Sequence, residues 1–510
     1  MGAVSRVFSG GVAVWLTIVT TFVTQLVSVP IYLSHWSSGV YGTWIAIQAS
    51  TGLLTILDQG HQQYLQNEFL RLGANDRLAV RRLFWSAAPV AILIGGTQLT
   101  VVWVLVHFGC LKSLFGGDES LLAASSTIVL AYLVHWVLLG SVGGIAVRVV
   151  SPFGYYPRMT WWNVKLGFIP SVLPLLAVSA GFPMLKTGCV WVGALFLVAL
   201  PQLWDIAHLF IKERLFPIAP EWRLGARTFF KSQSLVLKIL VDMARSQGTR
   251  ILLAPLAGAV ELANFATMRT GSNVALQALG TITNPLMPEL MRFLNRRDQS
   301  RSEAAFAMVW IVLIALMTPC VVVLQAVVAP LFEMWTRGKV PFDPALFALL
   351  SLGVLVYALA QPAMAVVMGN NLLRSQVLIA VIAALVVVGS MFLLVPRMGI
   401  LGAGVSLLTG ELVAAEGYRF ATRVWLRDNG LAWPHRQAAI ASLSVWIAAA
   451  AMGTIVCWPS AKWISLPIFL ILLACNLWRY WRALPDIATQ RAFALLAAVP
   501  GVRRLYLKRA

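Results

Sequence analysis

Four polar side chains follow one another along a single face of a predicted helix, inside an apolar segment of the chain. Lys238, Asp242, Arg245 and Thr249 are spaced by 4, 3 and 4 residues, which places them on one side of an α-helix. Counted from Gln233 at about 1.5 Å per residue, Asp242 and Arg245 lie about 14 and 18 Å into the segment. Ionisable groups at such a depth in a membrane are costly and are usually functional.

A fifth polar residue extends this pattern to the next apolar segment. Arg269 lies about 15 Å from the outer end of that segment, counted from Ala259, so a tight turn brings it to the depth of Arg245. One acid cannot neutralise three bases, and the excess positive charge predicts an anionic substrate. The planar guanidinium suits phosphate. The alternative is a closed salt bridge of Asp242 with Lys238 or Arg245 that holds the helices together.

Other ionisable residues in apolar segments allow two interpretations each. Lys165 and Arg250 are candidate ligands for the same anion, although both lie close enough to a membrane surface to extend toward it. Glu411 lies about 15 Å deep, where a lone carboxyl group is protonated or binds a cation. We therefore expect coupling to Na⁺ or H⁺ there. Pairing of this region's acids with Arg419 or Arg423 is the alternative.

A polar stretch, ILDQGHQQYLQNEFLRL (residues 56–72), follows an uncharged run without a Gly-Pro break. Eighteen residues from Val40 cover about 27 Å, so we expect Asp58 near the inner boundary of the hydrocarbon. The same helix is expected to continue into the cytoplasm or to line a vestibule. Asp58 and Asn67 are candidate gating residues. The alternative is a solvated helix extension without a further role.

These residues must be positioned by membrane helices. The chain has 510 residues, of which 59% are hydrophobic and 11% are charged, and its mean hydropathy is +0.80. Soluble domains are about a quarter charged, so the composition predicts an all-α polytopic membrane protein. At about 20 apolar residues per span, we expect fourteen transmembrane helices at 11–33, 40–58, 83–107, 121–147, 160–180, 187–210, 232–254, 259–284, 304–330, 345–368, 377–395, 401–424, 437–458 and 465–481.

The distribution of basic residues predicts the topology. With a cytoplasmic N-terminus, 28 of the 39 Lys and Arg residues lie in cytoplasmic loops and termini, six in outward loops and five in spans. This asymmetry places both termini in the cytoplasm. It accounts for most of the net charge of +20 without nucleic acid. The basic tail after residue 482 mixes Leu, Phe and Tyr with Arg and Lys, and we expect it to bind membrane lipids at the inner surface.

Motifs for catalysis and cofactor binding are absent from the sequence. No GxxxxGK[ST] loop occurs, and the five cysteines form no metal-ligand set, so we expect no metal and no cofactor apart from the coupling ion. A weak internal repeat aligns NEFLR (67–71) with PELMR (288–292). It predicts an N-terminal lobe at 1–215 and a C-terminal lobe at 216–436, followed at 437–510 by two extra helices and the tail.

The first two spans carry a family pattern. Tyr41-Gly42 opens the second span, an Asp-x-Gly follows at Asp58, and Asn67 comes nine residues later. Together with PLMPELMRF (285–293) and the segment 369–412, this pattern resembles the bacterial polysaccharide transporter family, the Wzx-like O-antigen and capsule-unit flippases. These belong to the multidrug/oligosaccharidyl-lipid/polysaccharide (MOP) exporter superfamily. The resemblance covers roughly residues 10–425.

The resemblance implies two six-helix lobes in a V, two further helices and alternating access. It implies transport of undecaprenyl-diphosphate-linked oligosaccharide across the bacterial inner membrane, with a polysaccharide polymerase and chain-length proteins as partners. Arg245 and Arg269 would belong to a cationic lumen. The members that flip lipid II carry basic residues in their first helices, whereas this chain has none between Arg6 and Arg71.

Two other classes of protein remain as alternatives. A multidrug or small-molecule exporter of the same superfamily usually has twelve spans and an acidic cavity. A polyprenyl-linked glycosyltransferase, polymerase or ligase normally carries a large periplasmic loop. The longest outward loops expected here, 108–120 and 331–344, have about 14 residues.

Overall fold

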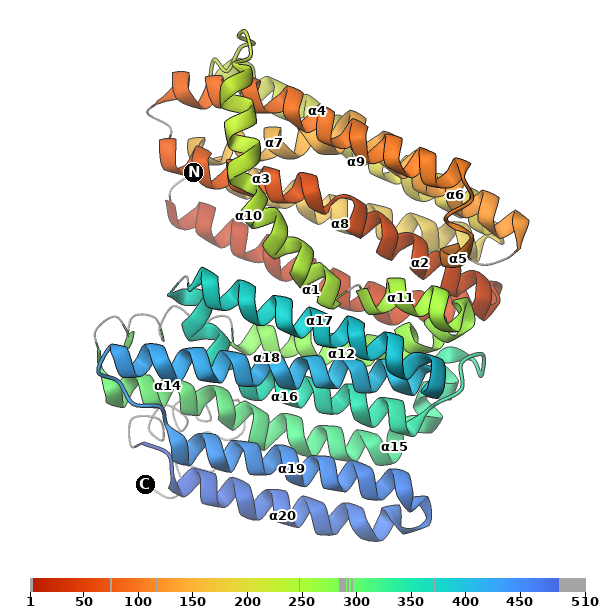
Figure 1. Cartoon of the computed structure of the whole chain (residues 1–510), viewed down its shortest axis with the longest axis vertical. Coiled ribbons are helices and arrows are strands. Elements are labelled where there is room, and N and C mark those ends of the chain that lie inside the picture. The colour runs from red at the N-terminus through yellow and green to blue at the C-terminus, as the bar shows by residue number, and fades with distance from the viewer. Residues whose placement is uncertain are drawn as a thin grey trace. The chain divides into compact units, whose positions relative to one another are not determined.

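All regular secondary structure in the described part of the chain is helical (Figure 1). The computed structural model describes residues 3–73, 76–115, 118–246, 248–283, 290, 293–294, 297–370 and 372–485. Among these residues, ten helices are long and apolar enough to cross a membrane. The number is eleven if α2 (Ser38–Leu54) and α3 (Ile56–Leu72) form one bent span. The chain is therefore an all-α polytopic membrane protein, which confirms the prediction.

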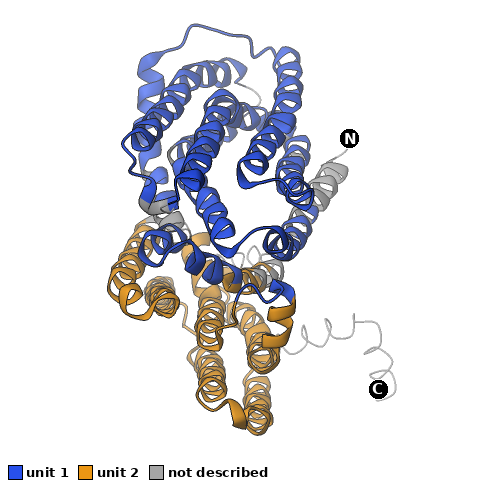
Figure 2. Ribbon diagram, turned by 90° about the vertical axis from the view of Figure 1, so that its right-hand side faces the viewer, with its two compact units in different colours: residues 1–267, 335–340 blue, residues 268–334, 341–510 orange. Residues whose placement is uncertain are grey.

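The chain divides into two compact units (Figure 2). Unit 1 comprises residues 1–267 and 335–340, and unit 2 comprises residues 268–334 and 341–510. Besides α2 and α3, the helices of unit 1 are α1 (Ala3–His35), α4 (Arg77–His107), α5 (Lys112–Phe115), α6 (Glu119–His135), α7 (Val142–Val149), α8 (Tyr156–Ser179), α9 (Met184–Lys212), α10 (Trp222–Ser246) and α11 (Gly248–Ala257). A π-helical turn, Trp136–Ser141, joins α6 to α7.

Helix α12 (Ala259–Thr283) begins in unit 1 and ends in unit 2. The remaining helices of the described chain are α14 (Gln299–Val312), α15 (Thr318–Thr336), α16 (Pro344–Gly369), α17 (Leu373–Met398), α18 (Ile400–Asp428), α19 (His435–Cys457) and α20 (Lys462–Arg482). A second π-helical turn, Leu313–Met317, joins α14 to α15.

Each of the fourteen expected spans coincides with a helix or with a broken helix. Helices α1, α10 and α12 cover three further positions and are not among the ten helices counted above. Helix α10 begins at Trp222, ten residues before the expected span 232–254, so part of the segment between the sixth and seventh expected spans is helical. The lobe boundary at residue 215 and the V arrangement stay predictions.

The polar stretch 56–72 is a separate helix, so the expectation of an uninterrupted helix is wrong. Helix α2 ends at Leu54, and α3 continues at a bend of 45°. At the break, the Thr55 hydroxyl donates to the carbonyl oxygens of Thr51, at 3.3 Å, and Gly52, at 3.1 Å. Hydroxyl groups that bond back to preceding carbonyls bend helices, which explains a break without proline.

The core of unit 1 forms where α3 packs between its neighbours. Helix α3 lies against α10, α7 and α4. Five residues on one face of α3 are at most 2% exposed: Asp58, His61, Gln62, Leu65 and Phe69. Their spacing of 3, 1, 3 and 4 residues is that of a buried helical stripe. The interpretation of this stretch as a solvated extension is therefore wrong for this face.

The core of unit 2 is apolar and centres on α16, which packs against α18, α19 and α14. Trp310 is 1% exposed and contacts the rings of Phe306 and Trp433. The last two helices are attached to this core by buried polar contacts. Tyr480 donates to the carbonyl oxygen of Ala307 at 2.8 Å, and Asn476 donates to the Ser444 hydroxyl at 2.6 Å.

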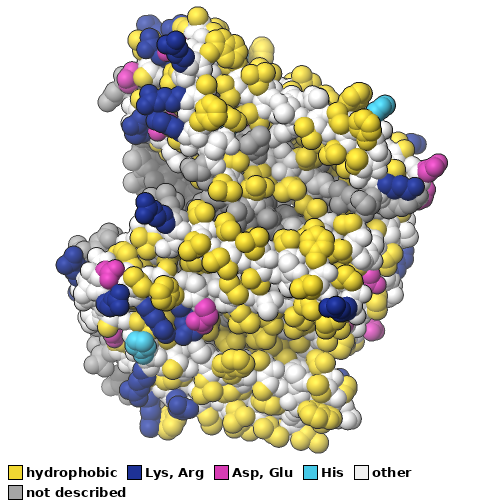
Figure 3. Space-filling model, in the orientation of Figure 1, with side chains coloured by type: hydrophobic (Ala, Val, Ile, Leu, Met, Phe, Trp, Pro, Cys, Tyr) yellow, Lys and Arg dark blue, Asp and Glu magenta, His cyan; other side chains and the backbone are white. Residues whose placement is uncertain are grey.

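The surface of each unit has the pattern of a membrane protein. Hydrophobic side chains cover the walls of the helices, whereas Lys and Arg side chains gather mainly at one end of them (Figure 3). Large apolar side chains such as Trp446 and Phe420 are more than 70% exposed. Exposed apolar belts of this kind face lipid rather than water.

Candidate functional site

A buried carboxylate lies at the centre of unit 1. Asp58 has no exposed surface, and its Oδ2 accepts a hydrogen bond of 2.9 Å from the indole nitrogen of Trp136. Arg148 is the cation whose charge acts on this carboxylate. A buried carboxylate without compensation is very unfavourable, and the Trp136 donor and the charge of Arg148 offset part of this cost.

The π-helical turn supplies acceptors to the same network. Wide turns of this type leave carbonyl groups free of the regular helical ladder and often occur at functional sites. The Gln62 amide donates to the carbonyl oxygens of Gly140 and Ser141, at 3.2 Å each. Its Oε1 accepts a bond of 2.7 Å from Arg148, which also donates to Gly144 O at 2.8 Å. Gln62 thus connects the turn to the arginine.

The glycine of the Asp-x-Gly pattern explains how α3 approaches α10. A Cβ atom built on Gly60 would lie 2.5 Å from the Val236 Cγ2 atom and 2.8 Å from its Cα atom. Only glycine allows this separation. One turn before Val236 in α10, the Ser232 hydroxyl lies 3.2 Å from a ring nitrogen of His61. The glycine of the pattern therefore helps to position Asp58, because it lets α3 pack closely against α10.

A cavity of about 280 Å³ lies elsewhere in unit 1, between α1, α2, α8 and α9. Thr21, Thr24, Gln25, Ser28 and Tyr32 line it from α1 at helical spacing. The other lining residues come from the three remaining helices: Tyr41, Trp44, Ile45, Gln48, Gly167, Pro170, Ser171 and Trp191. The cavity therefore combines aromatic rings with hydroxyl and amide groups.

A series of aromatic rings joins the cavity to the buried carboxylate. The ring centroids of Tyr32 and Trp44 are 6.1 Å apart, and those of Trp44 and Trp191 are 5.7 Å apart. Tyr132 stacks on Trp191 at 5.1 Å and on Trp136 at 6.4 Å. These distances are typical of favourable aromatic pairs. Trp136 in turn bonds to Asp58, so cavity and carboxylate belong to one packed assembly.

Arg250 of α11 lies beside this assembly. It is half-buried, and its guanidinium is the charge that acts on the Tyr41 hydroxyl. The adjacent Gly42 permits the approach of this part of the chain, because a Cβ atom there would lie 1.8 Å from the carbonyl oxygen of Ala259. The Tyr-Gly pair thus brings an aromatic side chain of the cavity next to a basic residue.

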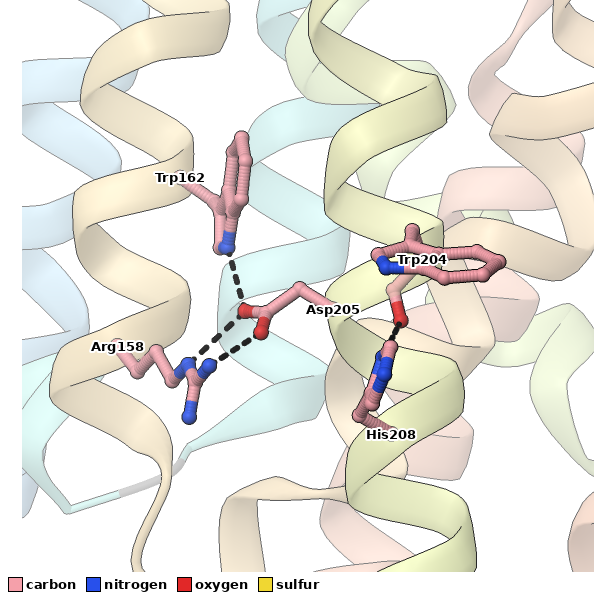
Figure 4. A network of polar contacts seen from close by, with 5 residues as sticks. All are labelled: Arg158, Trp162, Trp204, Asp205 and His208. Carbon is pink, nitrogen blue, oxygen red and sulfur yellow. Dashed lines mark hydrogen bonds and ion pairs between the residues drawn. The ribbon is translucent and has the colours of Figure 1, made fainter.

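A polar network joins α8 to α9 at one end of unit 1 (Figure 4). The Asp205 carboxylate accepts a two-point contact from the Arg158 guanidinium and a bond of 2.8 Å from the Trp162 indole nitrogen. His208 lies one turn further along α9 and contacts the Trp204 carbonyl oxygen at 2.9 Å. Lys165 is exposed and places its Nζ atom 4.0 Å from the Trp162 ring centroid. Lys165 therefore lies beside this network, through its contact with the Trp162 ring.

A larger cavity of about 670 Å³ lies between α3, α4 and α10. Acidic and basic side chains both line it: Glu68, Arg71, Asp76, Arg82, Glu221, Arg227 and Lys231. Arg71 pairs with Glu68 at 2.6 Å, and Arg82 pairs with Glu221 at 2.7 Å. The mixed charges distinguish it from the neutral cavity between α1, α2, α8 and α9.

The structure brings together only some of the residues that the sequence singled out. The side chains of Lys238, Asp242 and Arg245 lie outside the described residues, so their shared face stays a prediction. Arg269 and Glu411 are half-buried on α12 and α18, and both take part in polar or charged interactions.

Asn67 does not join the buried network around Asp58. It is exposed on α3, whereas Asp58 faces the core. Glu416 pairs with Arg419 at 2.7 Å, so the alternative of a local ion pair holds for this acid.

Sequence reasoning missed the partners of Asp58. Trp136 lies 78 positions further along the chain, and the topology placed Arg148 in a cytoplasmic loop. The available signals were weak. They were a tryptophan, two glycines and an arginine at the end of the fourth apolar segment.

The helical arrangement is similar to that of several solved transporters. The inward closed conformation of the lipid II flippase MurJ matches with a TM-score of 0.64 and 11% identity, covering 93% of this chain and 98% of that one. An inward-facing multidrug resistance MATE family transporter matches with a TM-score of 0.62 and 13% identity, covering 81% and 95%. A mutant of the Vibrio cholerae MATE transporter VcmN matches with a TM-score of 0.52 and 16% identity, covering 83% and 97%. At these identities the likeness concerns the fold.

Comparisons of sequence add no assignment. No protein-family profile matches the chain, and no curated protein matches it.

Proposed function

We propose that this chain is a flippase for undecaprenyl-diphosphate-linked oligosaccharide, the repeat unit of an O-antigen, capsule or exopolysaccharide. It moves this lipid from the cytoplasmic to the periplasmic leaflet by alternating access. One observation carries the proposal. The segment from α10 to α12 holds Lys238, Arg245, Arg250 and Arg269 within expected membrane spans, with Asp242 as the only acid on the face of Lys238 and Arg245. The MOP-type fold supports it.

The charge of the substrate explains why such residues are needed. A diphosphate carries about two negative charges, and its transfer through bare hydrocarbon is prohibitive. Basic side chains in a wet cavity replace the hydration of the diphosphate while the polyprenyl chain stays in the lipid. A membrane potential of about 100 mV, inside negative, favours outward movement by about 2.3 kcal/mol per negative charge.

We assign two groups of residues to this cycle. Basic residues bind the diphosphate: Arg245, Arg269, Lys238, Lys165 and Arg250. Acidic and amide residues gate the cavity or couple transport to Na⁺ or H⁺: Asp242, Glu411, Asp58 and Asn67. The half-buried position of Arg250 beside Tyr41 supports a ligand role, whereas the exposed position of Lys165 beside Trp162 suits a role at the membrane surface.

The proposed setting is the bacterial inner membrane, with both termini in the cytoplasm. The basic tail would bind anionic lipids there. A polysaccharide polymerase and chain-length proteins would receive the unit on the periplasmic side, and nucleic acid has no part in the cycle.

A small-molecule exporter is the second candidate function, because MATE transporters share the fold. The polarity of the substrate separates the two candidates. Cationic drugs favour acidic or aromatic sites, whereas the segment from α10 to α12 carries more basic than acidic residues. The binding pocket of a solved MOP superfamily transporter from Pyrococcus furiosus is described as having reverse polarity, which suggests a different function for that protein.

The test is the location of lipid-linked oligosaccharide after deletion of the gene. An impermeant sugar-reactive probe is applied to intact spheroplasts and to inverted vesicles. Complete units that accumulate on the cytoplasmic face support a flippase. Single units that accumulate on the periplasmic face indicate a polymerase or ligase, and no accumulation on either face favours an exporter, so both of these results contradict the proposal.

Variants connect this result to the proposed residues. Arg245→Ala and Arg269→Ala should reproduce the block when they replace the wild-type gene. Arg397→Ala removes an exposed charge near the end of α17 and should restore transport. Equal transport by all three variants, at equal protein levels, would contradict the assignment of Arg245 and Arg269.

A further inference from the structure

The described residues that line the cavity between α1, α2, α8 and α9 carry no charge. All thirteen side chains and backbone segments around it are neutral, and no Asp, Glu, Lys, Arg or His is among them. Its volume of about 280 Å³ is near the lower end of the range for small-molecule sites, ~300–1,000 Å³. A diphosphate would find no counter-charge among these thirteen residues, which makes this part of the cavity unsuitable for it.

The lining also carries neutral polar groups, which are hydroxyl and amide side chains. Gln48 lines the cavity and is exposed. The Ser28 and Ser171 hydroxyls donate to carbonyls of their own helices, at 3.1 and 2.6 Å, and their oxygens keep acceptor capacity. The lining thus offers amide and hydroxyl groups to a ligand.

One donor in the lining lacks a satisfactory partner. Trp44 is 1% exposed, and its indole N–H has no partner with hydrogen-bond geometry within the described protein. The hydroxyl of Tyr32 is its polar neighbour. Buried donors are nearly always satisfied, but this nitrogen is closed off from the cavity, so it is the ring of Trp44 that belongs to the lining.

Aromatic rings supply the apolar part of the lining. Tyr32, Tyr41, Trp44 and Trp191 all contribute to it. A sugar ring presents C–H groups on its faces, which pack on aromatic rings, and hydroxyl groups at its edge, which need neutral donors and acceptors. Lining and ligand therefore match on both counts.

We infer that this cavity binds uncharged sugar rings of the transported oligosaccharide. The inference rests on the proposed function, to which it adds a carbohydrate subsite. Arg250, the electrostatic neighbour of Tyr41, lies at the edge of this subsite and holds the diphosphate end of the same substrate. The subsite recognises the glycan by its shape and by hydrogen bonds. The basic residues bind the diphosphate, which all such lipids share.

The test uses full-length protein in nanodiscs and two soluble probes. The first is the oligosaccharide that mild acid releases from the lipid-linked pool of the source strain. The second is tetraphenylphosphonium, an aromatic cation. Binding of each is measured by saturation-transfer NMR, and transport of the intact lipid-linked unit is measured in vesicles. The variants are Trp44→Phe, Gln48→Ala and Trp191→Ala. Trp103→Phe is the control, because Trp103 is 55% exposed on α4 and does not line the cavity.

We expect each cavity variant to raise the Kd for the oligosaccharide about tenfold, the effect of one lost hydrogen bond or ring contact. Trp103→Phe should leave it unchanged. Gln48→Ala guards against misfolding, because the Gln48 side chain is exposed. Transport with unchanged oligosaccharide binding in all three cavity variants overturns the inference and leaves the flippase intact. Loss of tetraphenylphosphonium binding in the variants, with no oligosaccharide binding and no transport by the wild type, overturns both.

Discussion

The indole nitrogen of Trp136 donates a hydrogen bond of 2.9 Å to the carboxylate of Asp58, whose side chain is completely buried. The donor comes from a π-helical turn, and the acceptor comes from the first turn of a helix that bends away from its predecessor. The π-helical turn and the bend before α3 thus meet at the Asp58 carboxylate.

Trp136→Phe tests how much this bond contributes to folding. The substitution keeps an aromatic ring but removes the donor, and a buried carboxylate with one donor fewer should lower the free energy of unfolding by about 1–3 kcal/mol. Thermal and denaturant unfolding in detergent would measure the change. Trp204→Phe, on an exposed side chain of α9, should change it by less than about 0.5 kcal/mol. Equal losses in the two variants would contradict the prediction.

Gly60→Ala tests the close packing of α3 on α10. The added methyl group would lie 2.5 Å from a Val236 side-chain atom, so the helices must separate at a cost of about 1–3 kcal/mol. Gly52→Ala is the matched control, because no atom lies within 4 Å of a Cβ atom there. Alanine is the better helix former by about 1 kcal/mol, so Gly52→Ala should be neutral or stabilising. Gly60→Ala should therefore lower the midpoint of unfolding, whereas Gly52→Ala should leave it unchanged or raise it.

Asp205→Ala tests the network between α8 and α9. Its side chain is 14% exposed and accepts bonds from Arg158 and from the Trp162 indole, so its removal should cost about 1–3 kcal/mol. Glu416→Ala removes a pair of similar type on α18, where the acid is 66% exposed. Exposed pairs contribute about 0–1 kcal/mol. The same unfolding assay compares both, and a larger loss for Glu416→Ala would refute the distinction.

Glu411→Gln and Asp242→Asn test ion coupling. Each substitution removes a titratable group from an expected span, so the variant should no longer respond when ionophores collapse the H⁺ or Na⁺ gradient. The wild type should lose transport under the same treatment, measured as the leaflet distribution of the lipid-linked unit. Variants that remain as sensitive as the wild type would exclude these residues as coupling groups.

The helices were predictable because their signal is local. About 20 consecutive apolar residues define a span whatever surrounds them, and each of the fourteen expected positions carries a helix. The polar stretch 56–72 was different. Its polar residues indicated exposure, whereas Asp58, His61 and Gln62 are buried against α7 and α10. Tertiary partners decided their environment, and no local pattern identifies partners that lie 78 or more positions away.

The candidate sites show the same difference between local sequence signals and tertiary contacts. Tyr41 and Asp58 were found because their motif neighbours are close in sequence, and Gly42 and Gly60 now have a physical reason in helix packing. The neutral cavity was not found. Its lining comes from α1, α2, α8 and α9, each of which contributes ordinary Thr, Ser, Gln and aromatic residues. Only their convergence in space distinguishes them.

The π-helical turn also sets an angle. Trp136 and Arg148 are twelve positions apart, which in a regular α-helix at about 100° per residue directs them about 120° apart. A wide turn absorbs about one residue of rotation and reduces this angle to about 20°, so both side chains reach α3. Rewinding of Trp136–Ser141 into a regular α-helix at constant length would swing Arg148 by about 100° and carry it away from Gln62, whereas deletion of one residue there would remove the wide turn and keep the angle at about 20°. The turn therefore sets the direction of Arg148 relative to Trp136, and its winding at constant length decides whether Arg148 can contact Gln62.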